Sequence, residues 1–337
     1  MRAPELDGAR AVTEASRLSA EGLPVEFLDC VTANLAVLLR AAGSEHWLSA
    51  LGGEWHFEHQ PSADEPVNLR QSALEVVVSR FSGFTLERAP LVPLCQPGLL
   101  RQARHQPRLL LGDAFHLPWL PYYRKEHLAH SFVLADRAET SALIFDAYCN
   151  RTEWGMAEPK YAHVPVDTLE AAMAALEGKQ RGVYWWLGAR TPPAAPRELL
   201  LSNVSSPSGP LTGIAGFAEY YAARRNSVDL SRFVLACWQA HRARALHELW
   251  LRSSSVEAML PAGFADRFAS SVVAPWKRVN EFAFVLQRRA STGRSLPDSP
   301  FSLLREAIEP AERALTAELR QCLARGARNT AVQDANL

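Results

Sequence analysis

The sequence predicts an α+β protein, with an N-terminal part that combines helices with an antiparallel sheet and an all-α part after it. Three observations predict this fold class. An apolar helix begins near residue 30, two strand-like runs at 131–136 and 141–146 are separated by a short polar turn, and helical periodicity dominates after residue 211. Strands joined by such a short turn pair as an antiparallel hairpin.

The first predicted element is a helix from Cys30 to Arg40. Its apolar residues follow helical spacing: Val31, Leu35, Leu38 and Leu39. Asp29 is a good N-cap, so Cys30 should occupy the first helical turn, and the helix should end near Gly43. Backbone N–H groups without helical partners and the positive end of the helix dipole favour a thiolate at such a position.

The next hundred residues alternate between short elements and loops. Residues 47–57 predict a short helix, a glycine turn and an aromatic strand, and residues 58–68 predict a loop. Residues 74–81 are apolar and rich in β-branched side chains. A short helix is expected at 97–103, followed by a strand at 108–117 that prolines then interrupt.

A change of composition marks the expected domain boundary. A last strand-like run at 183–187 is followed by segments rich in Pro, Ser and Gly at 191–196 and 205–210. Beyond them the apolar residues lie on helical faces. We therefore predict two domains, residues 1–195 and residues 211–330.

The overall composition is that of an ordinary globular chain. Among its 337 residues, 36 basic and 36 acidic residues cancel, which argues against nucleic acid or an acidic membrane as a partner. We find no apolar signal core near the N-terminus and no apolar run long enough for a membrane span. We expect a soluble, cytoplasmic protein.

The cysteines give no sign of a disulfide framework or a thiolate zinc site. They are odd in number and widely spaced: Cys30, Cys95, Cys149, Cys237 and Cys322. A reducing compartment fits this pattern. We interpret all of them except Cys30 as structural, because they lack partners for acid–base chemistry in sequence order.

A nucleophilic thiol requires a base within hydrogen-bond reach, and an imidazole base requires a third group to orient it. His130 begins the first strand of the predicted hairpin and Asp146 ends the second. The start of one antiparallel strand lies opposite the end of the other, so these two side chains should meet. Cys30, His130 and Asp146 are thus the candidate catalytic triad.

Each of these residues also has a simpler interpretation. Cys30 and His130 are compatible with purely structural, buried side chains. Asp136, at the far end of the first hairpin strand, is a weaker rival for the orienting role. His127 and His130 form an H-x-x-H pair, but no carboxylate or thiol stands at ligand spacing, so we predict no metal site.

Four segments carry a resemblance to a known family: Asp29–Asn34, Gly112–Trp119, Tyr122–Leu134 and Ile144–Asp146. They resemble the peptidase C39-like branch of the papain-like superfamily, and within it the family of the N-terminal domain of butirosin biosynthesis protein H. The resemblance covers residues 22–190. The helical remainder looks like the companion domain often fused to that family. The chain is also similar to an uncharacterised bacterial family associated with amino acid:carrier-protein ligases.

The resemblance implies acyl transfer in specialised metabolism. Such proteins take an acyl or aminoacyl group from the phosphopantetheine thioester of an acyl or peptidyl carrier protein and pass it to an amine. Carried over to this sequence, Cys30 would be the nucleophile, His130 the base and then the acid, and Asp146 the residue that orients it. No cofactor is implied, because phosphopantetheine is the arm of the substrate.

The sequence departs from papain-like peptidases at the oxyanion hole. Those enzymes place a glutamine before the cysteine, and no glutamine precedes Cys30. Backbone N–H groups, with Thr32 or Asn34, would have to replace it. Weaker candidates for substrate contacts, each equally compatible with plain packing, lie in the middle of the chain: Asp113, Trp119, Tyr122, Tyr123 and His127.

Two rival functions remain open from sequence. With water as acceptor, the same triad would make a thioesterase or peptidase-like hydrolase. With a triad that has drifted, the fold would serve as a non-catalytic module that binds a carrier protein or small molecule. In the helical part, three basic pairs could receive an acidic carrier protein or simply be solvated: Arg224 and Arg225, Arg242 and Arg244, Arg288 and Arg289.

Overall fold

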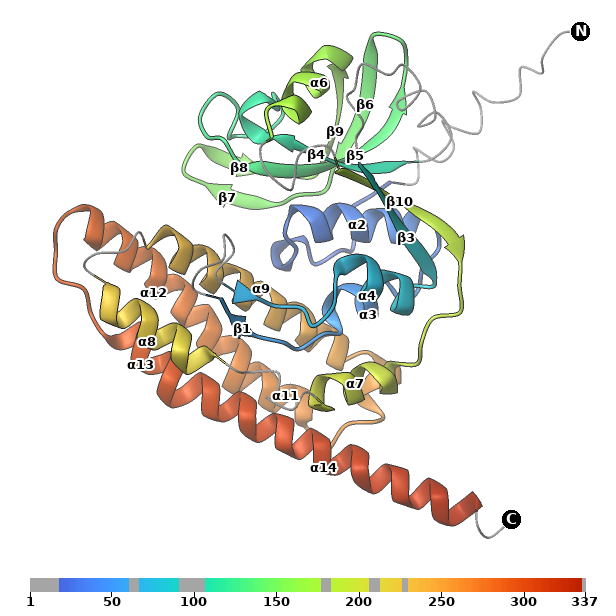
Figure 1. The fold of residues 1–337 in the computed structure, drawn as a ribbon, viewed down its shortest axis with the longest axis vertical. Coiled ribbons are helices and arrows are strands. Elements are labelled where there is room, and N and C mark those ends of the chain that lie inside the picture. Colours follow the sequence, from blue (N-terminus) through green and yellow to red (C-terminus); the bar gives the residue numbers. More distant parts are fainter. Residues whose placement is uncertain are drawn as a thin grey trace, which may run out of the picture. The chain divides into compact units, whose positions relative to one another are not determined.

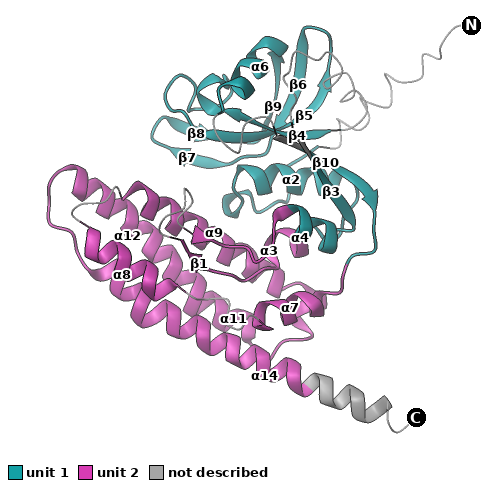
Figure 2. Cartoon of the chain, in the orientation of Figure 1, with its two compact units in different colours: residues 1–47, 75–193 teal, residues 48–74, 194–337 magenta. Residues whose placement is uncertain are grey.

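The computed structural model describes residues 18–60, 67–90, 107–176, 183–205, 213–225 and 230–334. Cys95 and the helix expected at 97–103 lie outside these ranges. The chain forms two compact units, which are coloured separately in Figure 2. Unit 1 comprises residues 1–47 and 75–193, and unit 2 comprises residues 48–74 and 194–337.

An antiparallel sheet is the centre of unit 1 (Figure 1). In the described part of the chain it has six strands, all paired antiparallel. Their order across the sheet is β3 (Phe84–Pro90), β10 (Val183–Arg190), β4 (Arg108–Asp113), β5 (Ala129–Arg137), β6 (Ser141–Asp146) and β9 (Lys160–Pro165). The α+β class with antiparallel pairing is therefore confirmed, as is the hairpin of β5 and β6.

The remaining elements of unit 1 are short. They are η1 (Val25–Phe27), α2 (Cys30–Ala41), α4 (Leu74–Phe81), η3 (Ala114–His116), the hairpin of β7 (Asn150–Thr152) and β8 (Gly155–Ala157), and α6 (Val166–Ala174). Helix α2 begins at Cys30 and ends just before Gly43, as predicted. It contacts β5, β4 and β6, and its residues 32–39 are buried.

The β-branched run at 74–81 forms helix α4. Val77, Val78 and Phe81 are buried, whereas Val76 is 56% exposed. This spacing gives one buried helical face, and packing of that face outweighs the weak preference of valine for strands.

Unit 2 is mainly helical, as predicted for the chain beyond residue 211. Its first segment holds α3 (Trp47–Gly52, whose first residue belongs to unit 1), β1 (Glu58–His59) and β2 (Val67–Asn68). Its second segment is helical throughout its described elements: α7 (Pro196–Ser205), α8 (Ile214–Arg224), α9 (Ser231–Leu251), α10 (Ser254–Glu257), α11 (Phe264–Phe268), η5 (Ala269–Val273), α12 (Ala274–Ser291), α13 (Ser299–Leu303), η6 (Leu304–Ile308) and α14 (Glu309–Asp334).

The aromatic strand expected at residues 55–57 is absent, because strand β1 begins only at Glu58. Trp55 and Phe57 instead lie fully buried among the helices of unit 2, against Phe268 and Trp276 respectively. The glycine turn before them fits closely: a Cβ on Gly53 would come within 1.8 Å of a Leu199 methyl group. This packing explains why residues 48–74 belong to the helical unit.

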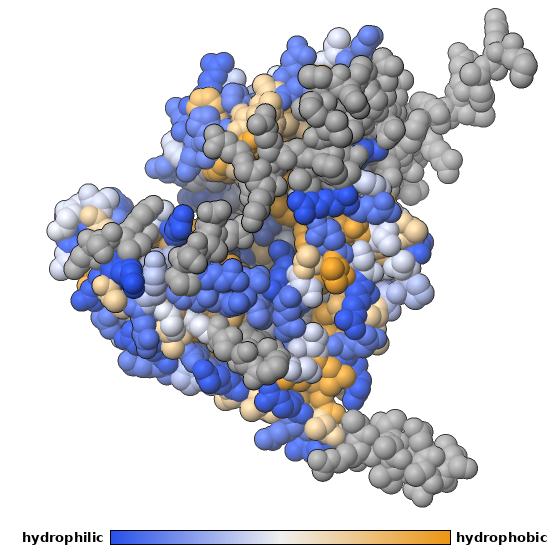
Figure 3. Space-filling model, in the orientation of Figure 1, coloured by the Kyte–Doolittle hydropathy of each residue, from blue (hydrophilic) through white to orange (hydrophobic). Residues whose placement is uncertain are grey.

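The face of unit 2 seen in Figure 3 is mainly hydrophilic, with hydrophobic residues gathered near α7. Among the described residues, no helix combines the length and apolar character needed to cross a membrane.

Candidate active site

The nucleophile candidate lies at the start of α2, where a local hydrogen-bond motif fixes the chain. The Asp29 carboxylate accepts hydrogen bonds from the Thr32 N–H at 2.7 Å and from the Thr32 hydroxyl at 2.8 Å. Asp29 is thus the predicted N-cap. Cys30, the first helical residue, is half-buried and unpaired with any other cysteine.

His130 and Asp146 lie side by side in the sheet. Their Nε2 and Oδ2 atoms are 2.7 Å apart, and the two side chains are 1% and 2% exposed. The β5–β6 register pairs Val133 with Phe145, so Asp146 is diagonal to His130 on the same face. Asp136 lies beyond a β-bulge in β5 and accepts a hydrogen bond from the adjacent Arg137 N–H, which removes it as a rival orienting residue.

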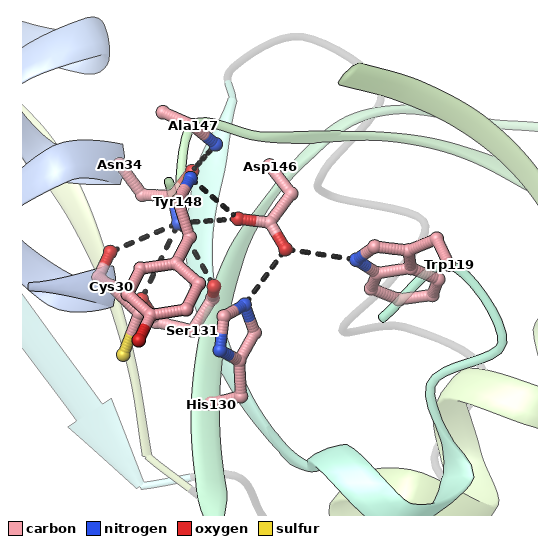
Figure 4. Close-up of polar contacts among 8 residues, drawn as sticks. All are labelled: Cys30, Asn34, Trp119, His130, Ser131, Asp146, Ala147 and Tyr148. Atoms are coloured by element: carbon pink, nitrogen blue, oxygen red, sulfur yellow. Dashed lines mark hydrogen bonds and ion pairs between the residues drawn. The ribbon is translucent and has the colours of Figure 1, made fainter. Parts of the chain in front are cut away.

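Donors surround the Asp146 carboxylate (Figure 4). Trp119 Nε1 donates to Oδ2 at 2.9 Å, while the Tyr148 N–H and Asn34 Nδ2 donate to Oδ1 at 3.0 and 3.3 Å. Burial alone would raise the pKa of Asp146, but the charge of His130 and the hydrogen bonds from His130, Trp119 and the Tyr148 N–H lower it below its ordinary value. Asp146 is therefore a buried carboxylate held in its ionised form.

The His130 imidazole has two partners, Asp146 and the side chain of Cys30. Since Nε2 faces Asp146, Nδ1 is the atom left for the thiol. Burial alone would lower the pKa of His130, but the negative charges of Asp146 and Cys30, with hydrogen bonds to both, raise it to about 10. The structure thus joins His130 to Asp146 through a hydrogen bond and places Cys30 where its charge acts on the same imidazole.

Asn34 connects the helix to this series. Its Nδ2 atom donates to the backbone carbonyls of Cys30 and Ser131 at 3.0 and 2.9 Å, and its Oδ1 accepts the Ala147 N–H at 2.9 Å. The side chain is fully buried. Asn34 therefore holds the start of α2 against β5 and β6.

The side chains of Thr32 and Asn34, expected to assist the backbone N–H groups of an oxyanion hole, already form hydrogen bonds within the protein. The Thr32 hydroxyl donates to Asp29, and the residue is only 4% exposed. Asn34 uses its amide hydrogens on groups of the protein itself. Thr32 serves the local cap of α2, because a polar side chain at a helix start can bond to neighbouring groups, whereas Asn34 ties the helix to β5 and β6.

The tyrosines of the proline loop differ from one another. Tyr122 is buried, and its hydroxyl hydrogen-bonds with the side chains of Tyr148 and Asn150. It also interacts electrostatically with Cys30. Tyr123 is half-exposed and stacks under the Arg124 guanidinium, 5.1 Å from the ring centroid. Only Tyr122 of this pair is placed beside the candidate nucleophile.

Asp113 and His127 form a separate pair. Asp113 Oδ2 lies 2.6 Å from His127 Nδ1, and its Oδ1 accepts the Phe115 N–H at 3.1 Å. The His127 ring stacks on Phe115 with centroids 4.2 Å apart. Asp113 thus caps η3 and anchors His127. The two histidines of the H-x-x-H motif pair with different carboxylates, His127 with Asp113 and His130 with Asp146. Within the described ranges, no group of three or more potential ligands could hold a metal ion.

Two contributors to the site were not recognised from sequence. Trp119 was a candidate for a substrate contact, but its indole N–H donates to Asp146. Tyr148 was not singled out, although its ring stands edge-to-face with that of His130 at a centroid distance of 5.2 Å. The signal for Tyr148 was its position two residues after Asp146, since extending the β5–β6 register three residues beyond the Val133–Phe145 pair places it opposite His130.

The basic pairs of unit 2 are not a continuous exposed surface. Arg244 is 1% exposed and ion-paired with Glu312, and Arg242 is 8% exposed with its guanidinium over Trp238. Arg225 pairs with Asp298. The middle pair is therefore excluded as a docking site for an acidic partner.

No protein-family model matches the chain, and no curated protein shows significant similarity to it. The fold and the site alone define its class: an α+β protein with a cysteine at a helix start that interacts electrostatically with a buried histidine, which is hydrogen-bonded to a buried aspartate.

Proposed function

We propose that unit 1 is a papain-like, C39-like domain that acts as a cysteine-dependent acyltransferase in specialised metabolism. The observation that carries the proposal is the series of Cys30, His130 and Asp146. A half-buried cysteine that interacts electrostatically with this imidazole supports catalysis rather than a drifted, purely binding role.

The proposed reaction has two acyl-transfer steps. The Cys30 thiolate attacks the carbonyl carbon of a carrier-protein thioester, and the oxyanion intermediate collapses as the C–S bond to phosphopantetheine breaks. His130 protonates the departing thiolate. An amine then attacks the acyl-cysteine, neutral His130 accepts its proton, and the amide leaves while Cys30 returns as thiolate.

Asp146 and its donors orient this chemistry. The carboxylate fixes Nε2 of His130 and stabilises the imidazolium, which leaves Nδ1 directed at the thiol. Trp119 and Asn34 hold one carboxylate oxygen each. With water as the acceptor, the same intermediate would give a hydrolase.

Intact-mass analysis after mixing the protein with acyl-loaded carrier proteins tests the proposal. We expect a mass gain equal to the acyl group, lost in Cys30→Ala. Cys322→Ala, another half-buried free cysteine, is the matched control and should label normally. Subsequent addition of an amine or of plain buffer separates transferase from hydrolase. Labelling that persists in Cys30→Ala would overturn the proposal.

A further inference from the structure

The proposed acyl transfer passes through an oxyanion, and the usual donor is missing. No glutamine precedes Cys30, and the side chains of Thr32 and Asn34 are used within the protein. The first N–H groups of a helix have no acceptor within the helix and could serve as donors, but the Thr32 N–H already donates to Asp29. A side-chain donor beside Cys30 has to come from another element.

Two tyrosines meet beside the thiol and imidazole. Tyr122 lies in the proline loop and Tyr148 just after β6, and their hydroxyls are hydrogen-bonded to each other. Tyr148 stands against the His130 ring, and Tyr122 interacts electrostatically with Cys30. In Figure 4 the side chains of Cys30, His130 and Tyr148 extend toward the same region, opposite to Asn34 and Ala147.

The surroundings hold the tyrosines in place. Tyr122, Tyr148 and Trp119 belong to one buried apolar cluster, and Cys30 packs against that cluster. The Trp154 ring lies edge-on to Tyr122 with centroids 5.7 Å apart. A preorganised donor of this kind costs no reorganisation during the reaction, which is the property an oxyanion hole requires.

The hydrogen bonds of Tyr122 suit it to donate. The hydrogen bonds with Tyr148 and Asn150 lower the pKa of Tyr122, because they favour its ionised form. Burial outweighs them and raises the pKa of Tyr122 above its ordinary value, so the phenol is protonated at neutral pH. A protonated phenol carries an O–H donor as well as two acceptor lone pairs, so it can donate to an oxyanion.

We infer that the Tyr122 hydroxyl, supported by Tyr148, donates the side-chain hydrogen bond of the oxyanion hole in place of the absent glutamine. This rests on the proposed function, since an oxyanion forms only if Cys30 attacks an acyl group. When the C–S bond forms, the carbonyl π electrons move to oxygen and Tyr122 stabilises that charge. When the leaving group departs, the carbonyl re-forms and the hydrogen bond weakens.

Two reactions of Cys30 test the inference. Acylation by p-nitrophenyl acetate passes through an oxyanion and needs no recognition of a carrier, whereas alkylation by iodoacetamide displaces iodide at a saturated carbon and forms none. We expect Tyr122→Phe to slow acylation on the order of a hundredfold, the typical effect of removing one oxyanion donor. Its alkylation rate should equal that of the unmodified protein.

Two further variants complete the experiment. Tyr148→Phe should slow acylation less than Tyr122→Phe and keeps the test open if the latter fails to fold, as judged by circular dichroism. Tyr123→Phe, in the same loop, should leave both rates unchanged. Equal loss of both rates in Tyr122→Phe, or no loss of acylation, would overturn the inference.

The outcomes separate this inference from the proposed function. Failure of the unmodified protein to react with acyl-carrier thioesters, while p-nitrophenyl acetate acylates Cys30 in a Tyr122-dependent manner, counts against the carrier-protein substrate alone. Absence of acylation by both reagents, with normal alkylation, would overturn both.

Discussion

The Nε2 atom of His130 lies 2.7 Å from Oδ2 of Asp146, in a part of the sheet where neither side chain is more than 2% exposed. Burial penalises each charge, but the carboxylate and the imidazolium stabilise each other because no water screens the attraction between them. Cys30 is a second group that raises the pKa of the imidazole. The charge state of the whole site therefore depends on each of its members.

Replacing Cys30 by serine should lower the pKa of His130. The negative charge of Cys30 and its hydrogen bond both raise that pKa, and a serine hydroxyl supplies no comparable charge. A pH titration of the imidazole ring followed by NMR, in the intact protein and in Cys30→Ser, measures the difference. Cys237→Ser, at a fully buried cysteine of unit 2, is the control. An unchanged His130 titration in Cys30→Ser would contradict the electrostatic coupling.

The stability of the fold should depend on pH through the His130–Asp146 pair. The folded-state pKa of His130 is about 10, against 6.5 ordinarily, so its stabilisation is complete below pH 6.5 and is lost as the pH rises through 10. The pKa of Asp146 is lowered, so its stabilisation is present above pH 3.8 and is lost as the pH falls through its folded value. The pair should stabilise the fold most between these limits, at about pH 4–6.5.

Chemical denaturation at pH 6 and pH 10 measures this effect. The unfolding free energy of the intact protein should fall between the two values, and the fall should be smaller in Asp146→Asn, which lacks the charge that raises the His130 pKa. His127→Gln, at the exposed histidine paired with Asp113, should keep the full fall. A difference between pH 6 and pH 10 that survives unchanged in Asp146→Asn would refute the assignment.

How much of this site can be predicted from sequence depends on how far apart along the chain the interacting residues lie. The Asp29 cap and the helix start at Cys30 follow from local rules, so they were predictable. The proximity of His130 and Asp146 follows from the antiparallel pairing of two strands in a hairpin, and the sequence also indicates that hairpin. The roles of Asn34 and Trp119 depend on where a helix and a loop lie against the sheet, and no local pattern encodes that.

The fold of unit 2 shows the same limit. Helical periodicity after residue 211 predicted its class. The membership of residues 48–74 was not predictable, because it depends on Trp55 packing against helices about two hundred residues later in the chain. Arg244 looked like a surface charge for the same reason: its partner Glu312 is 68 residues away in sequence.

Asn34 should be essential to the stability of unit 1. Asn34→Ala leaves the buried Ala147 N–H without its acceptor, which costs about 1–3 kcal/mol of unfolding free energy. Asn34→Asp restores an acceptor but places a carboxylate where the amide stood, 3.3 Å from Asp146 Oδ1. Repulsion between the two carboxylates should make it less stable at pH 8 than at pH 5.

Denaturation of both variants at pH 5 and pH 8 provides the measurement. Asn203→Asp is the matched control, because Asn203 is an equally buried amide whose hydrogen bonds go to the backbone of Gly53 and Trp55. It should show a smaller difference between the two pH values. A pH difference as large in Asn203→Asp as in Asn34→Asp would exclude Asp146 as its cause.

The core of unit 2 depends on one buried carboxylate. Glu312 is fully buried, pairs with Arg244 through two hydrogen bonds of 3.0 Å, and accepts hydrogen bonds from the indole N–H groups of Trp55 and Trp276 at 2.9 and 2.7 Å. Glu312→Leu should lower the unfolding free energy by about 3–5 kcal/mol, because it leaves the Arg244 charge buried without its partner.

A double-mutant cycle separates the ion pair from the indole contacts. Arg244→Met combined with Glu312→Leu should cost less than the sum of the single changes, because no buried charge is left unpaired. Denaturant titration followed by tryptophan fluorescence gives the free energies. The exposed i,i+4 pair of Arg252 and Glu248 is the control, for which replacement of one partner should cost only about 0–1 kcal/mol. Additive losses at Arg244 and Glu312 would show that the indole contacts, rather than the ion pair, make Glu312 indispensable.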